Sequence, residues 1–193
     1  MRKLVLFMHV SLDGFAADAN RGLGWISYDA DLQQYVDGIL ATVGSPVYGR
    51  ATYELMAGYW PTMLDNPDAS EREKAHAQWV DKATKIVFSK TMKKAEWNNT
   101  IVINDNIAEE INKLKQEPGK DLVIFGSPGL AHSLMELDLI DEYQLTLNPV
   151  LLGGGIPVYQ NIKNKTNLKL VKATPLKSGV VGLHYGLTGN GNS

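Results

Sequence analysis

The hydrophobic pattern of the chain begins with an uninterrupted run. Residues 2–10 are rich in large apolar and β-branched side chains and contain no glycine or proline, which predicts a buried strand. A loop rich in Asp, Gly and Asn follows over residues 11–25. From Asp29 to Val43 apolar side chains recur every three or four positions, which predicts an amphipathic helix with one face toward a core.

Short strands and helices alternate through the middle of the chain. Each predicted strand is a short apolar or β-branched run, and the four lie at residues 46–48, 85–88, 100–103 and 122–125. The helices are predicted at residues 50–58 and 71–82, after a cap at Asn104 or Asp105, and after Ser127-Pro128.

The last quarter of the chain consists of strands alone, predicted at residues 143–150, 167–174 and 180–187. Strand–helix alternation followed by a run of strands predicts an α/β fold with a mostly parallel central sheet, antiparallel C-terminal edge strands and helices on both faces. The 193 residues show no repeat or linker, so we expect a single domain over residues 1–188. Residues 189–193 are expected to be a disordered tail.

Composition excludes several classes of protein. The net charge of -2 gives no general attraction to nucleic acid or to an anionic membrane. The chain has no cysteine, which excludes disulfides and thiolate metal sites, and its four histidines lack metal-like spacing. The N-terminal apolar run is too short for a signal peptide, and no run approaches the roughly 18 apolar residues of a membrane span. We therefore expect a soluble, cytoplasmic protein without a metal.

Candidate chemistry lies at three predicted strand ends. Residues 49–52 (Gly-Arg-Ala-Thr) and 126–129 (Gly-Ser-Pro-Gly) each follow a strand and open a helix, where free amides and the helix dipole favour anions. Residues 89–91 (Ser-Lys-Thr) add two hydroxyls and an ammonium group. Each segment also has a structural interpretation, as a turn glycine, a helix cap or a polar strand end, and for any one segment taken alone that interpretation is favoured. None matches a P-loop or the Rossmann fingerprint.

Five segments, taken in order, resemble the dihydrofolate reductase superfamily, and most closely its branch with the reductase domain of bacterial riboflavin biosynthesis. They are residues 10–14 (VSLDG), 49–54 (GRATYE), 87–91 (VFSKT), 125–130 (FGSPGL) and 148–155 (NPVLLGGG). The resemblance implies a dihydrofolate reductase-like three-layer sandwich that binds NADPH.

The same resemblance implies a role for ten residues in cofactor binding. The diphosphate would lie against Gly49, Arg50, Thr52, Gly126, Ser127, Gly129 and Leu130, and the adenosine phosphate against Ser89, Lys90 and Thr91. Many relatives have two adjacent glycines where this chain has Gly126-Ser127, and folate reductases join them by a cis peptide. Whether the Gly126-Ser127 peptide is cis stays open at this point.

Two carboxylates are candidates for assisting protonation of the substrate. Asp31, in residues 30–32 (Ala-Asp-Leu), resembles the helix-start carboxylate of folate reductases. Asp13 is the alternative if the chain follows the riboflavin branch. Each also has a structural interpretation, because acids are favoured in the first turn of a helix and Asp commonly precedes Gly in turns.

The resemblance therefore implies hydride transfer from NADPH to a small pterin-, pyrimidine- or sugar-like substrate. One alternative is the 5-amino-6-(5-phosphoribosylamino)uracil reductase of riboflavin biosynthesis. Another is a non-catalytic nucleotide-binding protein with the same fold. We also expect a homodimer formed through the C-terminal strands, since residues 180–183 (Val-Val-Gly-Leu) would otherwise leave an apolar sheet edge exposed.

Overall fold

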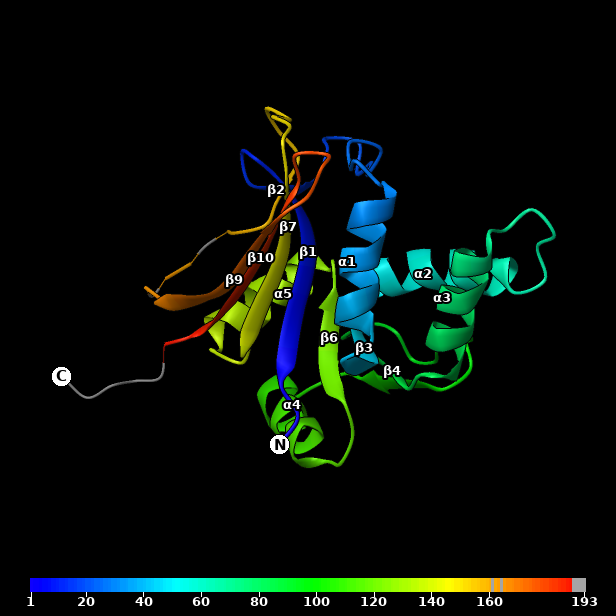
Figure 1. Ribbon diagram of the computed structural model, residues 1–193. Helices are drawn as coiled ribbons and strands as arrows, with labels where there is room; N and C mark the ends of the chain where they lie inside the picture. The colour runs from blue at the N-terminus through cyan, green and yellow to red at the C-terminus, as the bar shows by residue number, and fades with distance from the viewer. Residues whose placement is uncertain (161, 164, 189–193) are drawn as a thin grey trace.

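The computed structural model describes residues 1–160, 162–163 and 165–188. Its central element is an eight-stranded sheet with the strand order β5-β4-β3-β6-β1-β7-β10-β9 (Figure 1). The strands are β1 (Leu4–Ser11), β3 (Val43–Gly49), β4 (Lys85–Phe88), β5 (Thr100–Ile103), β6 (Asp121–Phe125), β7 (Glu142–Asn148), β9 (Leu168–Pro175) and β10 (Val181–Leu187). The tail predicted at residues 189–193 lies outside the described residues.

Strand direction confirms the predicted architecture. The six strands from β5 to β7 are parallel, whereas β10 runs antiparallel to β7 and β9 antiparallel to β10. Five helices cover the sheet: α1 (Ala30–Leu40), α2 (Arg50–Met63), α3 (Glu71–Lys82), α4 (Ile107–Gln116) and α5 (Pro128–Glu136). In Figure 1, α1 lies in front of the sheet and α4 and α5 lie behind it.

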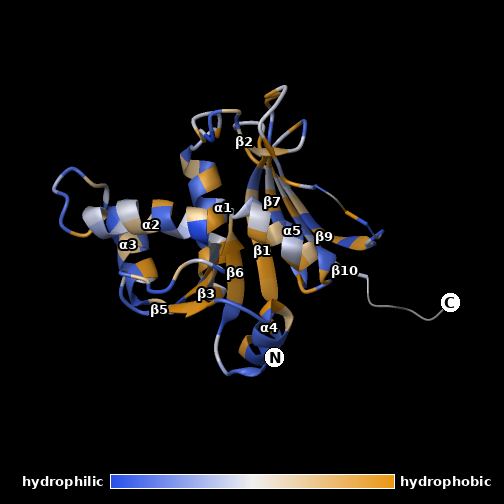
Figure 2. Cartoon of the chain, turned by 180° about the vertical axis from the view of Figure 1, so that it is seen from behind, coloured by the Kyte–Doolittle hydropathy of each residue, from blue (hydrophilic) through white to orange (hydrophobic). Residues whose placement is uncertain are grey.

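The central strands are apolar on both faces because helices cover both sides. In β1, Leu4, Leu6 and Met8 pack in the cluster that contains α4 and α5, whereas Phe7 packs on the opposite face with α1. Figure 2 shows hydrophobic residues concentrated on the central strands β1, β3 and β6. A third cluster joins Tyr53 of α2 to β3 and β4 on the α1 face. The result is a three-layer arrangement.

Some boundaries differ from those predicted. Helix α1 ends at Leu40, three residues before the predicted end, because Val43 is buried as the first residue of β3. Helix α2 extends to Met63 and includes Pro61 in its last turn. The N-cap position of α4 is Asn106, whose side chain makes no capping hydrogen bond, so the predicted cap at Asn104 or Asp105 was wrong. The small sheet of β2 (Phe15–Ala17) and β8 (Ile156–Pro157) was not predicted, since such short strands carry no readable periodicity.

The sequence-based reason for a dimer was also wrong in detail. Strand β10 is not an edge, because it pairs with β7 on one side and β9 on the other. Val180, just before it, is completely buried in the cluster under α1. The C-terminal edge is β9, which exposes Leu168, Leu170 and Val171. Among the described residues, no helix is long and apolar enough to cross a membrane.

The glycine run 153–155 joins the small sheet to the end of β7. Gly155 has φ +146°, and a Cβ there would lie 2.0 Å from the carbonyl oxygen of Ala17 in β2. Gly153 has φ +70°, whereas a Cβ on Gly154 would meet open space. Close packing of the backbone against β2 therefore requires glycine at position 155 and not at position 154.

Gly155→Ala is expected to destabilise the protein by roughly 1–3 kcal/mol, the usual cost of overpacking, because the backbone of β2 cannot move away cheaply. Gly154→Ala is the matched control and should leave the free energy of unfolding within about 0.5 kcal/mol of the parent value. Urea denaturation of the three proteins measures both effects. Equal stability of the two variants would contradict the contact with Ala17.

Candidate functional site

A cavity of about 540 Å³ opens at the carboxyl ends of β3, β4 and β5. Five of the residues predicted to bind a cofactor line it, namely Gly49, Ser89, Lys90, Gly129 and Leu130. Arg50, Thr52, Thr91, Gly126 and Ser127 belong to the same three segments but do not line the cavity itself. Segments separated by about 40 residues in the chain therefore meet at one place.

Three helices begin beside this cavity, and none of them has a side-chain cap. Gly49 precedes α2, Asn106 precedes α4 and Ser127 precedes α5, each without a capping hydrogen bond from its side chain. Helices α1 and α3, by contrast, are capped by the side chains of Asp29 and Ser70. The amides of the uncapped helix N-termini are free to bind an anion, and their dipoles favour one.

Ser127 connects two of these helix starts. Its hydroxyl is buried and accepts a hydrogen bond of 3.1 Å from the backbone amide of Gly49. The Gly126-Ser127 peptide is trans, and both residues lie in the left-handed region, with φ of 57° and 49°. Because the Ser127 side chain bonds to Gly49, it does not cap α5, and the amides of that helix stay available.

The segment 89–91 is held in place by neighbours that sequence reasoning only partly identified. Arg50 Nη1 donates to the hydroxyl of Thr91 at 2.9 Å, so two of the predicted segments are in direct contact. Asn104 was not predicted as a site residue. Its side-chain amide donates to the carbonyls of Ser89 (2.6 Å) and Met92 (2.8 Å). Its position immediately after β5, in line with the other polar strand ends, is the signal that could have identified it.

The carboxylate of Asp13 is exposed but is held by two backbone amides and one hydroxyl. It accepts hydrogen bonds from the amides of Leu152 (3.0 Å) and Gly153 (2.7 Å) and from the hydroxyl of Ser11 (2.6 Å). These hydrogen bonds, that of Ser11 first, lower the pKa of Asp13. Asp13 therefore ties the turn after β1 to the loop after β7.

Asp31 lies in the first turn of α1; it is less exposed than Asp13, but its carboxylate has fewer partners among the described residues. Its side chain is 32% exposed, and one of its oxygens lies 3.8 Å from Nζ of Lys177, which is 90% exposed. An exposed pair at this distance contributes little energy, so the carboxylate stays accessible. One turn further along α1, the ring of Tyr35 lies so close to Gly182 that a Cβ there would be 2.4 Å from it, which fixes α1 over β10.

His9 is a polar residue of β1 that sequence reasoning did not single out. It lies near the carboxyl end of β1, between the rings of Phe7 (5.1 Å between centroids) and Tyr28 (5.6 Å). Its Nδ1 lies 2.5 Å from the hydroxyl of the fully buried Thr146 in β7. Burial lowers the pKa of His9 to about 4, so the ring is neutral at pH 7. Only the pairing of β1 with β7 brings these side chains together.

Comparison with known proteins identifies the family. The model of the RibD C-terminal domain matches residues 2–182. The uncharacterized protein YyaP of Bacillus subtilis is 38% identical over 184 residues, which cover 95% of this chain and 94% of that protein.

Solved structures agree in fold. A putative riboflavin biosynthesis protein from Shewanella sp. PV-4 superposes with a TM-score of 0.75 at 19% identity, covering 96% of this chain and 98% of that one. Dihydrofolate reductase from Enterococcus faecalis, complexed with NADP(H), superposes with a TM-score of 0.63 at 16% identity, covering 96% of both chains. The fold is dihydrofolate reductase-like, and the chain belongs to the RibD C-terminal domain family.

Proposed function

We propose that this protein is an NADPH-dependent reductase that transfers a hydride to a small, ring-containing substrate of pterin, pyrimidine or sugar type. The observation that supports it most directly is the cavity at the carboxyl ends of β3, β4 and β5. Free amides at the starts of α2, α4 and α5 surround it, and Lys90 adds a cation. This arrangement suits a ligand that carries several phosphate groups.

The residues present fit such a dinucleotide. In the proposed binding mode, the free amides that follow Gly49 at the start of α2 and the amide of Gly129 bind the diphosphate, and Arg50, held by Thr91, lies beside it. Ser89 and Lys90 bind the additional phosphate that distinguishes NADPH from NADH. When bound, NADPH supplies the hydride from C4 of its nicotinamide ring.

The protein's own residues orient the substrate and handle the proton. Asp31 is the carboxylate that we assign to assisting protonation, because it is accessible and held by a rigid helix. Asp13 has a structural role, since its oxygens are already bonded to Leu152, Gly153 and Ser11. General acid catalysis of this kind contributes about 10²–10⁴-fold in rate.

The alternative substrate is the phosphoribosylaminopyrimidine of riboflavin synthesis, which the family match favours. A phosphorylated substrate needs a free cation; of two cations beside α1, Arg72 is paired with Asp37, whereas the exposed Lys177 lies 3.8 Å from Asp31 and stays accessible. A non-catalytic nucleotide-binding protein is the remaining alternative. NADPH oxidation in the presence of a substrate panel distinguishes an enzyme from a binding protein.

A homodimer formed through β9 is part of the proposal. Leu170 and Val171 on this edge strand are 50% and 58% exposed, and an unprotected apolar strand edge favours pairing with another chain.

The first prediction concerns cofactor preference. The protein should bind NADPH more tightly than NADH, and Lys90→Ala should weaken NADPH binding by about 1.5–3 kcal/mol, the scale of a charge-assisted hydrogen bond. Affinity for NADH should stay unchanged, because NADH lacks the phosphate that Lys90 binds. Lys94→Ala, a change to another exposed lysine of the same loop, is the matched control. Fluorescence titration measures all these affinities, and equal affinity of the parent protein for the two cofactors would refute the assignment of residues 89–91.

A second prediction separates the two carboxylates. Asp31→Asn should lower turnover by about 10²–10⁴-fold while NADPH affinity is unchanged, because only the proton step is lost. Asp13→Asn should chiefly lower the melting temperature, since it weakens the hydrogen bonds to the loop after β7. Steady-state kinetics and thermal unfolding of both variants provide the measurements. Normal turnover by Asp31→Asn together with an inactive, stable Asp13→Asn would reverse the two roles.

The third prediction concerns assembly. Size-exclusion chromatography with light scattering should return twice the 21.2 kDa mass of one chain at micromolar concentration. Leu170→Glu should shift the protein to monomer by placing a charge on the β9 edge, whereas Leu55→Glu, at an exposed position of α2, should not. A monomeric parent protein would rule the dimer out.

A further inference from the structure

Residues 89–92 form a turn that begins where β4 ends and lies beside the end of β5. In this parallel pair Phe88 is opposite Ile103, and the amide of Ser89 continues the ladder by donating to the carbonyl of Ile103 at 3.0 Å. The register therefore places Asn104, the first residue after β5, next to Ser89. Both residues line the cavity.

The side chain of Asn104 bridges the two ends of this turn. Its Nδ2 donates to the carbonyl of Ser89 at 2.6 Å and to the carbonyl of Met92 at 2.8 Å. Because both partners are carbonyl oxygens, only the NH₂ group of the amide can face them, and both of its hydrogens are used. Asn104 thus holds the first and last residues of the turn together, which constrains the direction of Lys90 between them.

The side-chain oxygens of the turn already accept hydrogen bonds. The hydroxyl of Ser89 accepts from the amides of Thr91 (3.3 Å) and Met92 (3.0 Å). The hydroxyl of Thr91 accepts from Arg50 at 2.9 Å. Each hydroxyl keeps its hydrogen for donation, and the exposed Lys90 adds an ammonium group. The side chains of the turn therefore offer donors to a ligand, as a phosphate group requires.

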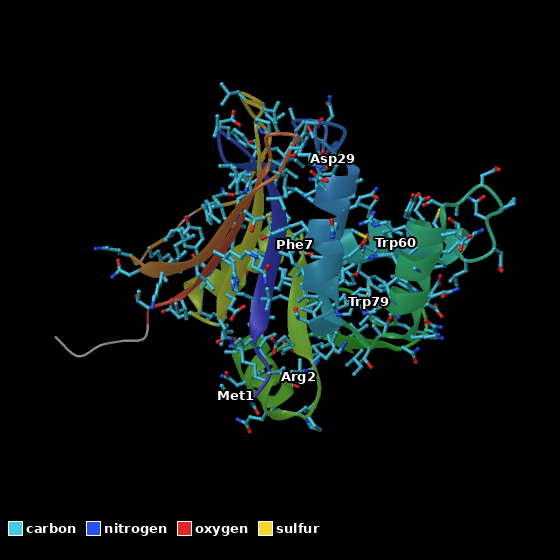
Figure 3. All side chains as sticks on the ribbon, in the orientation of Figure 1. Met1, Arg2, Phe7, Asp29, Trp60 and Trp79 are labelled. Carbon is cyan, nitrogen blue, oxygen red and sulfur yellow. The ribbon has the colours of Figure 1, made fainter. Side chains whose placement is uncertain are left out.

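The far end of this segment is anchored independently of Asn104. The backbone amide of Trp97 donates to the hydroxyl of Tyr53 at 3.1 Å. Trp97 lies in the buried cluster against which Trp60 and Trp79 also pack, and Figure 3 shows these two tryptophans on the side of α1 that faces α2 and α3. Loss of the Asn104 side chain should therefore loosen the turn without releasing the rest of the segment.

We infer that Asn104 is a positioning residue for the additional phosphate of the cofactor. By holding the carbonyls of Ser89 and Met92, it keeps the ammonium group of Lys90 at the cavity and so sets the preference for NADPH over NADH. This inference rests on the proposed function and deepens it, since it names the residue that orients the donors of the turn.

The test measures the affinities of the full chain for NADPH and NADH by fluorescence titration. Asn104→Ala should weaken NADPH binding about five- to tenfold, the scale of one or two hydrogen bonds. NADH affinity should stay within about twofold of the parent value, because NADH lacks the phosphate that the turn holds. Asn98→Ala is the matched control, since Asn98 is exposed in the same segment and donates to Asp81 at 3.2 Å. It should change neither affinity.

A double-mutant cycle shows whether Asn104 acts through Lys90. If Asn104 orients the ammonium group, removing that group first leaves little for Asn104 to orient. The double variant Asn104→Ala/Lys90→Ala should therefore bind NADPH no more than about twofold more weakly than Lys90→Ala alone. A purely structural contribution of Asn104 would instead multiply with the loss caused by Lys90→Ala.

Hydrogen exchange follows the turn in the absence of any cofactor. The amides of Thr91 and Met92 donate to the hydroxyl of Ser89, so they should exchange faster in Asn104→Ala than in the parent protein. In Asn98→Ala they should exchange at the parent rate. Thermal unfolding verifies that each variant is folded. If Asn104→Ala does not fold, Asn104→Ser, which loses one of the two donated hydrogen bonds, is judged by the same comparisons.

The outcomes separate this inference from the proposed function. A parent protein that binds neither dinucleotide overturns the proposed function and the inference with it. NADPH binding that is unchanged in Asn104→Ala, or weakened equally with NADH binding, overturns the inference alone, because an equal loss means that Asn104 serves a part common to both cofactors. Losses that multiply in the double variant, or unchanged exchange of the turn amides, overturn it as well.

Discussion

Six parallel strands, from β5 to β7, bring all their carboxyl ends to one edge of the sheet, and helices that follow three of them begin there. Parallel strands need a crossover connection, and here α2, α4 and α5 serve as crossovers after β3, β5 and β6. Each crossover helix must therefore start at the same edge. The cavity and the free amides beside it are consequences of that single geometric constraint, and free amides at helix N-termini are groups that favour anions.

Ser127 shows how local strain supports this arrangement. A non-glycine residue in the left-handed region costs on the order of 1–2 kcal/mol, and Ser127 adopts it with φ 49°. The hydrogen bond from the amide of Gly49 to its buried hydroxyl offsets part of this cost. The same contact ties the start of α2 to the start of α5, so the free amides at the starts of these two helices keep a fixed separation. Strained backbone held by tertiary contacts is common where ligands bind.

The cavity at the ends of β3, β4 and β5 and the face of the sheet under α1 differ in their side chains. In the cavity, helix N-termini lie beside one cation, Lys90, and one carboxylate, Asp105, with Phe88 as the aromatic residue of the lining. On the α1 face, the rings of Phe7, Phe125 and Trp79 pack edge to face beside the neutral ring of His9.

The sequence by itself determined the order and kind of the main elements, because burial between two helical layers imposes apolar runs on strands and amphipathic periodicity on helices. The sequence also identified the three polar segments that meet at the cavity, residues 49–52, 89–91 and 126–129. Polar residues directly after an apolar strand are a local signal that marks the end of the strand. Whatever depends on distant partners was decided only by the tertiary structure. His9 is oriented by Thr146, Asp13 is bonded to the loop after β7, and β10 lies inside the sheet, where sequence reasoning expected an edge. Each of these rests on contacts between residues far apart in the chain, and such contacts leave no periodic trace in the sequence around either partner.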